Sequence, residues 1–267
     1  MSGKAVRQHY MREFKGLDGH SRSRATLIVF GYLSQVIMAA ALGYWIVQYP
    51  VDVWSVVAIV LIIFFIGTRL RGFNNIVHEC SHFAFTRDRA SNIFFGRLCA
   101  SLVLSCYKDY REEHMTHHAH LGDYERDMDL HGIQDLRIED PLTPRTILRH
   151  LVSPLVGLHL PYYLGANLSN RDGTPFLLLK YGLIVAAVAA MAADPLAATL
   201  FVWVPFVWVY SAINYWTDCI DHGGLIESED DLESSRNVAV PRALRWLLFP
   251  RNDSFHLVHH LFPNVPA

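Results

Sequence analysis

Long runs without charged residues dominate two parts of the sequence. One part holds uncharged runs over residues 25–49 and 53–68, separated by a turn that contains a proline. The other holds 176–193, with one lysine near its start, and 196–216. An apolar helix needs roughly 20 residues to cross a bilayer, with about 17 as the lower limit. The pattern therefore predicts an all-α integral membrane fold of four transmembrane helices in two hairpins, at about 25–49, 51–68, 176–193 and 196–216.

Lysine and arginine are distributed unevenly around these four runs. They are frequent in the polar leader, residues 1–24, just after the second run and along the central segment, but they are absent from the two short turns. The positive-inside rule then places both turns outside, and the leader, 69–175 and 217–267 together on the cytoplasmic side. We therefore expect a single membrane domain, 1–267, with both termini and a helical cap in the cytoplasm.

Shorter apolar segments and one proline complete the predicted architecture. Residues 93–106 are apolar but too short to span and contain Arg97, which indicates a buried or interfacial helix. Residues 151–168 have the mixed character of a helix lying at the headgroup level. Pro205 predicts a kink within the fourth span.

Composition excludes some classes of function and draws attention to histidine. The sequence is 52% hydrophobic, which is high for a soluble protein and favours a bilayer location. The net charge of -2 gives no electrostatic case for a nucleic-acid partner. The four cysteines are scattered and form no CxxC pair, which argues against a disulfide framework and a zinc-thiolate site. Fifteen histidines are present, and neutral imidazole is the commonest protein metal ligand.

Eight of the histidines fall into three short motifs on the predicted cytoplasmic side. The first motif has the spacing HxxxH, and the second and third have the spacing HxxHH; their histidines are His78 and His82, then His114, His117 and His118, then His256, His259 and His260. Residues three and four apart share one face of a helix, so each motif presents its imidazoles together. His222, just past the fourth span, is expected to project toward the same layer.

Nine imidazoles are too many for one ion of four to six ligands, but they suit two ions with four or five ligands each. A dinuclear metal site follows. A nitrogen-rich ligand set suits zinc, copper, iron or nickel and excludes calcium and magnesium, so the ligands alone do not select the metal. The other six histidines lack partners at ligand spacing and are left without a metal role: His9, His20, His120, His131, His150 and His159.

Carboxylates close to the motifs are candidate acceptors for the distal imidazole N–H groups, which would fix the ring orientation. Glu79, Glu112, Glu113 and Asp221 belong to this set, and Asp218 and Asp253 are the favoured members. Asp218, Asp253 and Glu79 are also candidates for direct metal ligands.

Two other functions fit parts of the pattern. The first motif, HECSH, also matches the HExxH pattern of membrane zinc metalloproteases, with Glu79 as general base. That match leaves the two HxxHH motifs without a role. A metal carrier or sensor would need acidic residues or histidines within the spans, which are nearly free of them.

With its motifs placed on this topology, the chain resembles the membrane fatty acid desaturase and hydroxylase superfamily, the histidine-box non-haem di-iron proteins. The likeness rests on the three motifs, on His222 and on the closing stretch from Asn252 to Pro263, and it covers nearly the whole chain. It implies two iron ions held by the nine histidines, dioxygen as co-substrate, and electrons from a separate ferredoxin, rubredoxin or cytochrome. Relatives commonly continue past the third motif, which makes a chain ending at Ala267 a candidate piece of a longer protein.

The resemblance also implies the reaction, which is desaturation or hydroxylation of an unactivated C–H position in a lipid-like substrate. A fatty acyl desaturase is favoured; the alternative is a hydroxylase of an alkyl, sphingolipid or carotenoid-like substrate. Asp218 stands where acyl-CoA desaturases have Asn, and the three-residue spacer of the first motif resembles the acyl-lipid, sphingolipid and alkane-oxidising branches. Three aromatic residues are candidates either to line the substrate site or to anchor the helices at the membrane interface: Tyr210, Tyr215 and Trp216.

Overall fold

The computed structural model of the chain describes residues 2–14, 16–121, 123–226, 228, 230 and 232–266. Met1 and Lys15 of the predicted leader and the terminal Ala267 lie outside the described residues. All regular elements of the described part are helices, and its single β-type contact is an isolated bridge between His20 and Thr86. The prediction of an all-α fold is confirmed for this part of the chain.

Four helices are long and apolar enough to cross a membrane, and each overlaps one predicted span. They are α2 (Arg22–Val47), α3 (Val53–Ser81), α8 (Thr174–Ala193) and a continuous helix over Pro195–His222. The last comprises α9 (Pro195–Ala198), a π-helical stretch (Thr199–Tyr210) and α10 (Ser211–His222). Pro205, where the sequence predicts a kink, lies inside this π-helical stretch, whose wider turns accommodate a residue without a backbone N–H.

The outer surfaces of these helices carry large apolar side chains. Met38 on α2, Trp54 on α3 and Val185 on α8 are 70%, 76% and 66% exposed. Continuous exposure of this kind would be unfavourable in water and matches the hydrocarbon core of a bilayer. The inner faces pack closely: a Cβ added at Gly67 of α3 would lie 2.4 Å from Cγ1 of Val209, so glycine permits the close contact between these two helices.

The remaining helices are shorter and gather at one end of the four long helices. They are α1 (Gly3–Tyr10), α4 (Arg89–Leu102), α5 (Tyr107–His120), α6 (Pro144–Val152), α7 (Leu160–Tyr163), α11 (Arg242–Leu248) and α12 (His256–Leu261), with 3₁₀ turns at Gln134–Leu136, Ser153–Val156 and Pro250–Asn252. We call α1, α5, α6, α7, α11, α12 and their connecting segments the cap.

Two predicted short helices differ in extent from those observed. The apolar segment 93–106 is mostly in α4, which meets α5 at an angle of 104°. The single helix expected over 151–168 is instead the end of α6, a 3₁₀ turn and α7. Pro154 lies in that turn and Gly157 follows it with a φ of 80°, so the helix cannot continue through this region.

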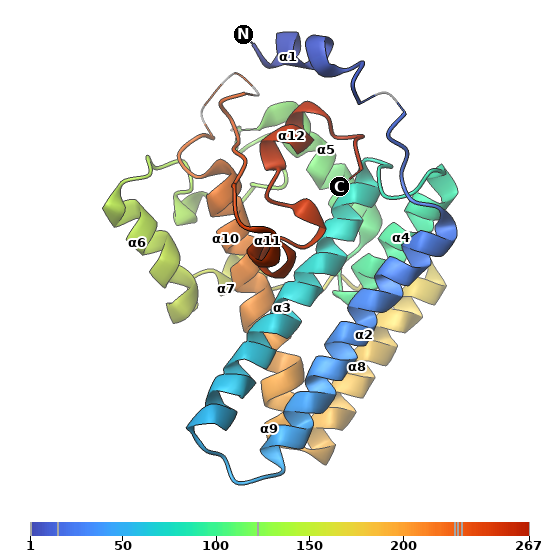
Figure 1. Ribbon diagram of the computed structural model, residues 1–267, viewed down its shortest axis with the longest axis vertical. Coiled ribbons are helices and arrows are strands. Elements are labelled where there is room, and N and C mark those ends of the chain that lie inside the picture. The colour runs from blue at the N-terminus through green and yellow to red at the C-terminus, as the bar shows by residue number, and fades with distance from the viewer. Residues whose placement is uncertain are drawn as a thin grey trace.

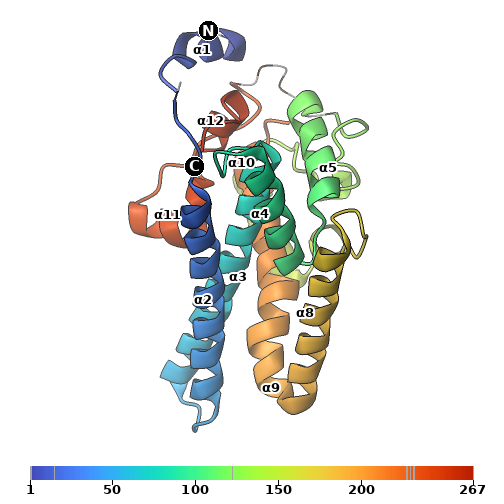
Figure 2. The ribbon, with the colours of Figure 1, turned by 90° about the vertical axis from the view of Figure 1, so that its right-hand side faces the viewer.

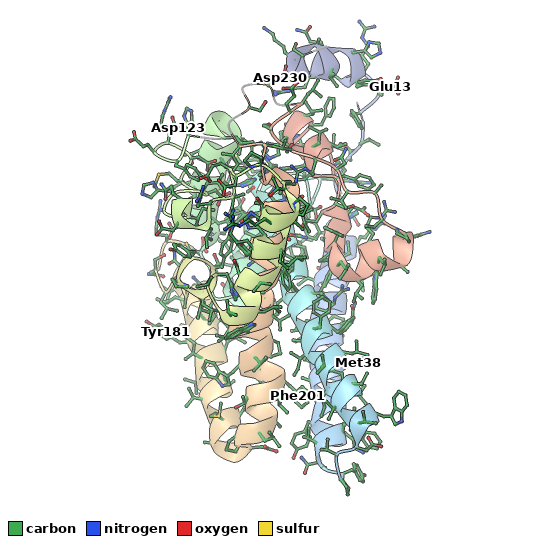
Figure 3. The ribbon with its side chains drawn as sticks, turned by 90° about the vertical axis from the view of Figure 1, so that its left-hand side faces the viewer. Glu13, Met38, Asp123, Tyr181, Phe201 and Asp230 are labelled. Atoms are coloured by element: carbon green, nitrogen blue, oxygen red, sulfur yellow. The ribbon has the colours of Figure 1, made fainter. Side chains whose placement is uncertain are left out.

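The histidine-bearing segments lie at one end of an elongated molecule (Figure 1, Figure 2). Figure 1 and Figure 2 show the α2–α3 and α8–α9 connections at the far end from the cap, and both chain termini at the cap end. In Figure 3, Met38 and Phe201 lie along the long helices, whereas Glu13, Asp123 and Asp230 lie at the cap end.

Candidate metal centre

The first histidine motif lies on α3 itself, because this helix does not end where its apolar run ends. It continues from Thr68 to Ser81, with its later turns buried beneath the cap. His78 is therefore part of a long, well-anchored helix, and His82 caps its C-terminus. The i, i+4 spacing brings their rings to 5.5 Å between centroids.

The other histidines come from three further helices. α5 carries His114, His117 and His118, α10 ends at His222, and α12 carries His256, His259 and His260. The fold thus brings together all nine histidines that the sequence singles out, from positions as far apart as residues 78 and 260.

The nine imidazoles divide into two groups, each with ligand nitrogens within 4.8 Å of one another. The first group contains His78, His82, His114, His118 and His259, and the second contains His117, His222, His256 and His260. The motifs of α5 and α12 each contribute histidines to both groups, but with opposite assignments. On α5 the i, i+4 pair enters the first group and the i+3 residue the second, whereas on α12 the pair enters the second group and the i+3 residue the first.

The nitrogen atoms within each group approach closely. In the first group, Nε2 of His114 lies 3.0 Å from Nε2 of His82 and 3.2 Å from Nε2 of His118, which lies 3.0 Å from Nε2 of His259. In the second group, Nε2 of His256 lies 2.9 Å from that of His222 and 3.0 Å from that of His260. Two ligands at right angles around an ion, with metal–nitrogen bonds of about 2.1 Å, would be about 3.0 Å apart.

The opposite ring nitrogens of several histidines face oxygen atoms. Nδ1 of His114 lies 2.8 Å from Asp129, Nδ1 of His117 lies 2.9 Å from Asp127, and Nδ1 of His256 lies 3.4 Å from Asp221. Nδ1 of His222 lies 3.0 Å from the backbone carbonyl of Ser234. The hydrogen bonds to Asp129, Asp127 and the Ser234 carbonyl place the proton on Nδ1 of His114, His117 and His222, so each of these three presents an Nε2 lone pair toward its group.

This arrangement fits a pair of cations. The Nε2 lone pair of His222 faces the Nε2 of His256 at 2.9 Å, and the buried Nε2 of His78 has no hydrogen-bond partner among the described residues. A bound cation between such lone pairs would satisfy them. Neutral imidazoles do not compensate the positive charge of bound cations. The carboxylates of Asp127, Asp129 and Asp221 would offset part of that charge.

Burial keeps most of these histidines neutral. It lowers the pKa of His82 to about 2, assisted by the charges of His114 and Arg111. It also holds the pKa values of His256, His259 and His260 well below the usual range. His117 differs: burial acts to lower its pKa, but the hydrogen bond and the charge of Asp127 outweigh it and the pKa is raised.

The acids favoured from sequence take other partners. Both oxygens of Glu79 bind Arg251, at 2.6 and 2.7 Å, so neither faces a histidine or is free to act as a general base. Asp253 pairs with Arg71 at 2.9 Å because this segment is docked against α3. Asp218 accepts a hydrogen bond of 2.7 Å from the Tyr163 hydroxyl.

Glu112 and Glu113 also lie apart from the imidazole N–H groups. Glu112 pairs with Arg171 at 2.6 Å, and the backbone carbonyl of Glu113 accepts a hydrogen bond from Thr116. Asp221, the remaining acid of the predicted set, lies beside His256. Sequence reasoning missed Asp127 and Asp129, which follow the second motif by about ten residues in a segment without regular periodicity.

The six histidines left without a metal role lie outside both groups. Nδ1 of His150 lies 2.6 Å from the Tyr215 hydroxyl, and Nε2 of His159 lies 3.1 Å from the Ser211 hydroxyl, so these two take part in buried polar contacts. Nδ1 of His131 lies 3.0 Å from the carbonyl of Tyr124.

Polar and apolar cavities adjoin the helices that carry the histidines. One, of about 250 Å³, is lined by histidines of both groups and by Asp129, Asp218, Asp221 and Asp253. Another, of about 430 Å³, is almost wholly apolar and lies between α3, α6, α10 and the segment after α11, with Phe64, Ile213, Trp216 and Phe249 in its wall. Trp216 is thus at a cavity, whereas Tyr215 is fully buried and Tyr210 packs in the core of the long helices.

In sequence, the chain is similar to known desaturases. The sequence profile described as fatty acid desaturase matches residues 52–267. The dihydrorhizobitoxine desaturase of Bradyrhizobium elkanii is 26% identical over 224 residues, which cover 77% of this chain and 64% of that protein. The "Probable fatty acid desaturase DES1" of Sorghum bicolor is 28% identical over 258 residues, 85% of this chain and 62% of that protein. The sn-1 acyl-lipid omega-3 desaturase (ferredoxin) of Synechocystis sp. is 24% identical over 216 residues, 71% of this chain and 58% of that protein. The chain therefore spans less than two thirds of the length of these relatives.

Proposed function

The chain belongs to the membrane fatty acid desaturase superfamily, and on that premise we propose that it is a di-iron oxidoreductase of the bilayer. It would use dioxygen and external electrons to introduce a double bond into a lipid-like substrate, most simply a fatty acyl chain. The observation that carries this proposal is the gathering of nine imidazoles into two groups with inward-facing lone pairs. The choice of iron rests on the family, because a nitrogen ligand set accepts several metals.

In this proposal the first and second groups each hold one ion. When bound, the two ferrous ions would supply the reduction of dioxygen and the oxidising power needed to remove hydrogen from an unactivated carbon, which amino-acid side chains cannot provide. The protein supplies position and protonation state. Asp129, Asp127 and the carbonyl of Ser234 hold the rings of His114, His117 and His222 in the tautomer that leaves Nε2 free to bind metal.

The apolar cavity supports a lipid-like substrate. Its lining residues Trp216, Thr217 and Ile220 belong to α10, the helix that ends at His222, so a chain in this cavity would run alongside a helix that carries a metal ligand. Its walls offer almost no polar group with which to hold a polar molecule. A cavity of this size lies within the range of small-molecule sites, about 300–1,000 Å³.

Membership of this family also supports a proposal for the membrane topology and the electron donor. Two membrane-spanning hairpins with the cap, both termini and the centre in the cytoplasm would agree with the positive charges that flank the spans. A cytoplasmic electron donor would then reach the cap directly. Three of the relatives are named as acyl-lipid omega-3 desaturases (ferredoxin), which favours a separate donor of the ferredoxin, rubredoxin or cytochrome type.

The experiment that tests the proposal combines metal analysis with product analysis. Purified protein is expected to hold about two irons per chain and to consume oxygen with substrate and reductant. Lipid extracts of cells with and without the chain, grown under oxygen, are expected to differ by a new double bond. A new hydroxyl instead would identify the hydroxylase alternative. A preparation fully active with zinc alone would overturn the proposal.

A further inference from the structure

The short helix α11 crosses α3 near the edge of the hydrocarbon region. The Trp246 ring lies 6.0 Å from the Phe65 ring, and the Arg69 guanidinium lies 4.6 Å from the centre of the Trp246 ring. Arg69 is 16 residues after Val53, where α3 begins, or about 24 Å along the helix at 1.5 Å per residue. The hydrocarbon core is about 30 Å thick, so α11 lies close to its boundary with the headgroups. Figure 2 shows α11 projecting from the side of the molecule beside α2.

Arg69 holds α11 firmly against α3. It is 1% exposed, and it donates hydrogen bonds of 2.8 and 2.9 Å to the carbonyls of Trp246 and Leu247. The outer face of α11 remains open, with Leu244 and Trp246 47% and 57% exposed. This apolar face continues the exposed apolar surface of α2 and α3, so lipid would cover all three.

A cationic cavity lies between α11, the segment after it and α2. Its volume is about 280 Å³, and its lining includes Tyr32, Trp246 and three arginines, Arg242, Arg245 and Arg251. Glu79 neutralises Arg251. No carboxylate in the described part of the chain lies within ion-pair distance of Arg242 or Arg245. The cavity therefore presents two uncompensated guanidinium groups at the edge of the lipid-facing surface.

We propose that this cavity, which we call the arginine pocket, binds the anionic phosphate headgroup of a membrane phospholipid. Guanidinium groups bind phosphate oxygens through paired hydrogen bonds, and basic pockets between membrane helices favour anionic lipids. The continuous apolar surface of α2 and α11 would take the acyl chains, while Tyr32 and Trp246 lie at the headgroup level that such rings prefer. No histidine of the metal centre lines this cavity, and the proposal does not require the proposed oxidoreductase activity.

The test measures lipid binding to the intact protein in neutral detergent by native mass spectrometry. The probes are dioleoylphosphatidylglycerol, dioleoylglycerol, which lacks the phosphate, and inorganic phosphate. Phosphatidylglycerol is expected to bind at least tenfold more tightly than the other two. An arginine beside an anionic lipid contributes about 1 kcal/mol, so R242Q/R245Q is expected to weaken phosphatidylglycerol binding about thirtyfold.

The control variant R12Q/R145Q removes the same number of charges from two exposed arginines outside the pocket and is expected to bind as the unmodified chain does. Arg242 is exposed, but Arg245 lies 5.0 Å from the centre of the Phe255 ring, so thermal unfolding of each variant verifies that it is folded. Equal binding of phosphatidylglycerol and dioleoylglycerol, or equal losses in the two double variants, would overturn the proposal. Tight binding of inorganic phosphate alone would assign the pocket to a soluble anion instead.

Discussion

The hydrogen bond between Asp127 and His117 offers a direct test of which ring nitrogen of this histidine is free to bind metal. Asp127 is completely buried, and its Oδ2 accepts from Nδ1 of His117 while its Oδ1 accepts from the backbone N–H groups of Asp129 and Leu130. Asp127→Asn preserves the shape and the Oδ1 contacts, but it places an amide donor against the Nδ1 donor of His117. The histidine must then adopt the other tautomer, which protonates Nε2, or lose its partner.

The magnitude follows from the kind of bond that is lost. A hydrogen bond to a charged group contributes about 1.5–3 kcal/mol, and removal of a partner behind a metal-binding histidine typically costs about 10–100-fold in metal affinity. Those two figures agree, because a tenfold change in affinity is about 1.4 kcal/mol. We expect Asp127→Asn to weaken the ion of the second group, which contains His117, by this amount.

Chelator competition with cobalt(II) would measure the two affinities, because its absorption reports the ligand environment. Asp129→Asn is expected to weaken the ion of the first group instead, since its partner His114 belongs there. Asp123→Asn serves as the matched control, because Asp123 is half-buried in the same segment, belongs to neither histidine group, and its Oδ1 contacts with the backbone N–H groups of Glu125 and Arg126 can be kept by Asn. Cobalt affinities unchanged in Asp127→Asn, or lost from the first group alone, would refute this account of the hydrogen bond.

Three further outcomes are expected. Asp172→Ala removes the carboxylate that accepts from the first backbone N–H groups of α5, and we expect it to cost about 1–2 kcal/mol, seen as a lower unfolding temperature; an unchanged temperature would contradict this capping role. Gly67→Ala places a methyl group 2.4 Å from Val209 and should destabilise the chain by about 1–3 kcal/mol. Gly31 has open space around it, so Gly31→Ala should be neutral or stabilising. Similar unfolding temperatures for the two variants would rule out the close contact. Burial lowers the pKa of His82 to about 2, so below about pH 6.5 the unfolded chain binds more protons than the folded chain. We therefore expect both the free energy of unfolding and the metal content to fall as the pH drops from there. Metal and helical content retained at about pH 4 would contradict this pH dependence.

The sequence predicts the positions of the four long helices because each depends on a local property, a run of apolar residues without charge. It does not predict that α3 continues to Ser81, because its later turns carry polar residues such as Asn75 and Glu79. Those turns are held by contacts with distant segments: Asn75 donates a hydrogen bond of 2.7 Å to the carbonyl of Pro250, and Glu79 pairs with Arg251. Contacts of this kind leave no periodic signal in the sequence.

The division of the histidines between two groups depends on the same contacts. The spacing HxxHH identifies three imidazoles on one helical face, but it cannot say which of them meet those of another helix. α12 has only six residues, too few to form a stable helix alone, so its orientation must come from the segment before it. Arg71 holds that segment through Asp253, and Asn214 on α10 accepts from the same guanidinium at 2.9 Å. Arg71 therefore connects the three helices that carry His78, His222 and His256, and contacts between these segments, rather than the motifs themselves, determine which imidazoles face the same ion.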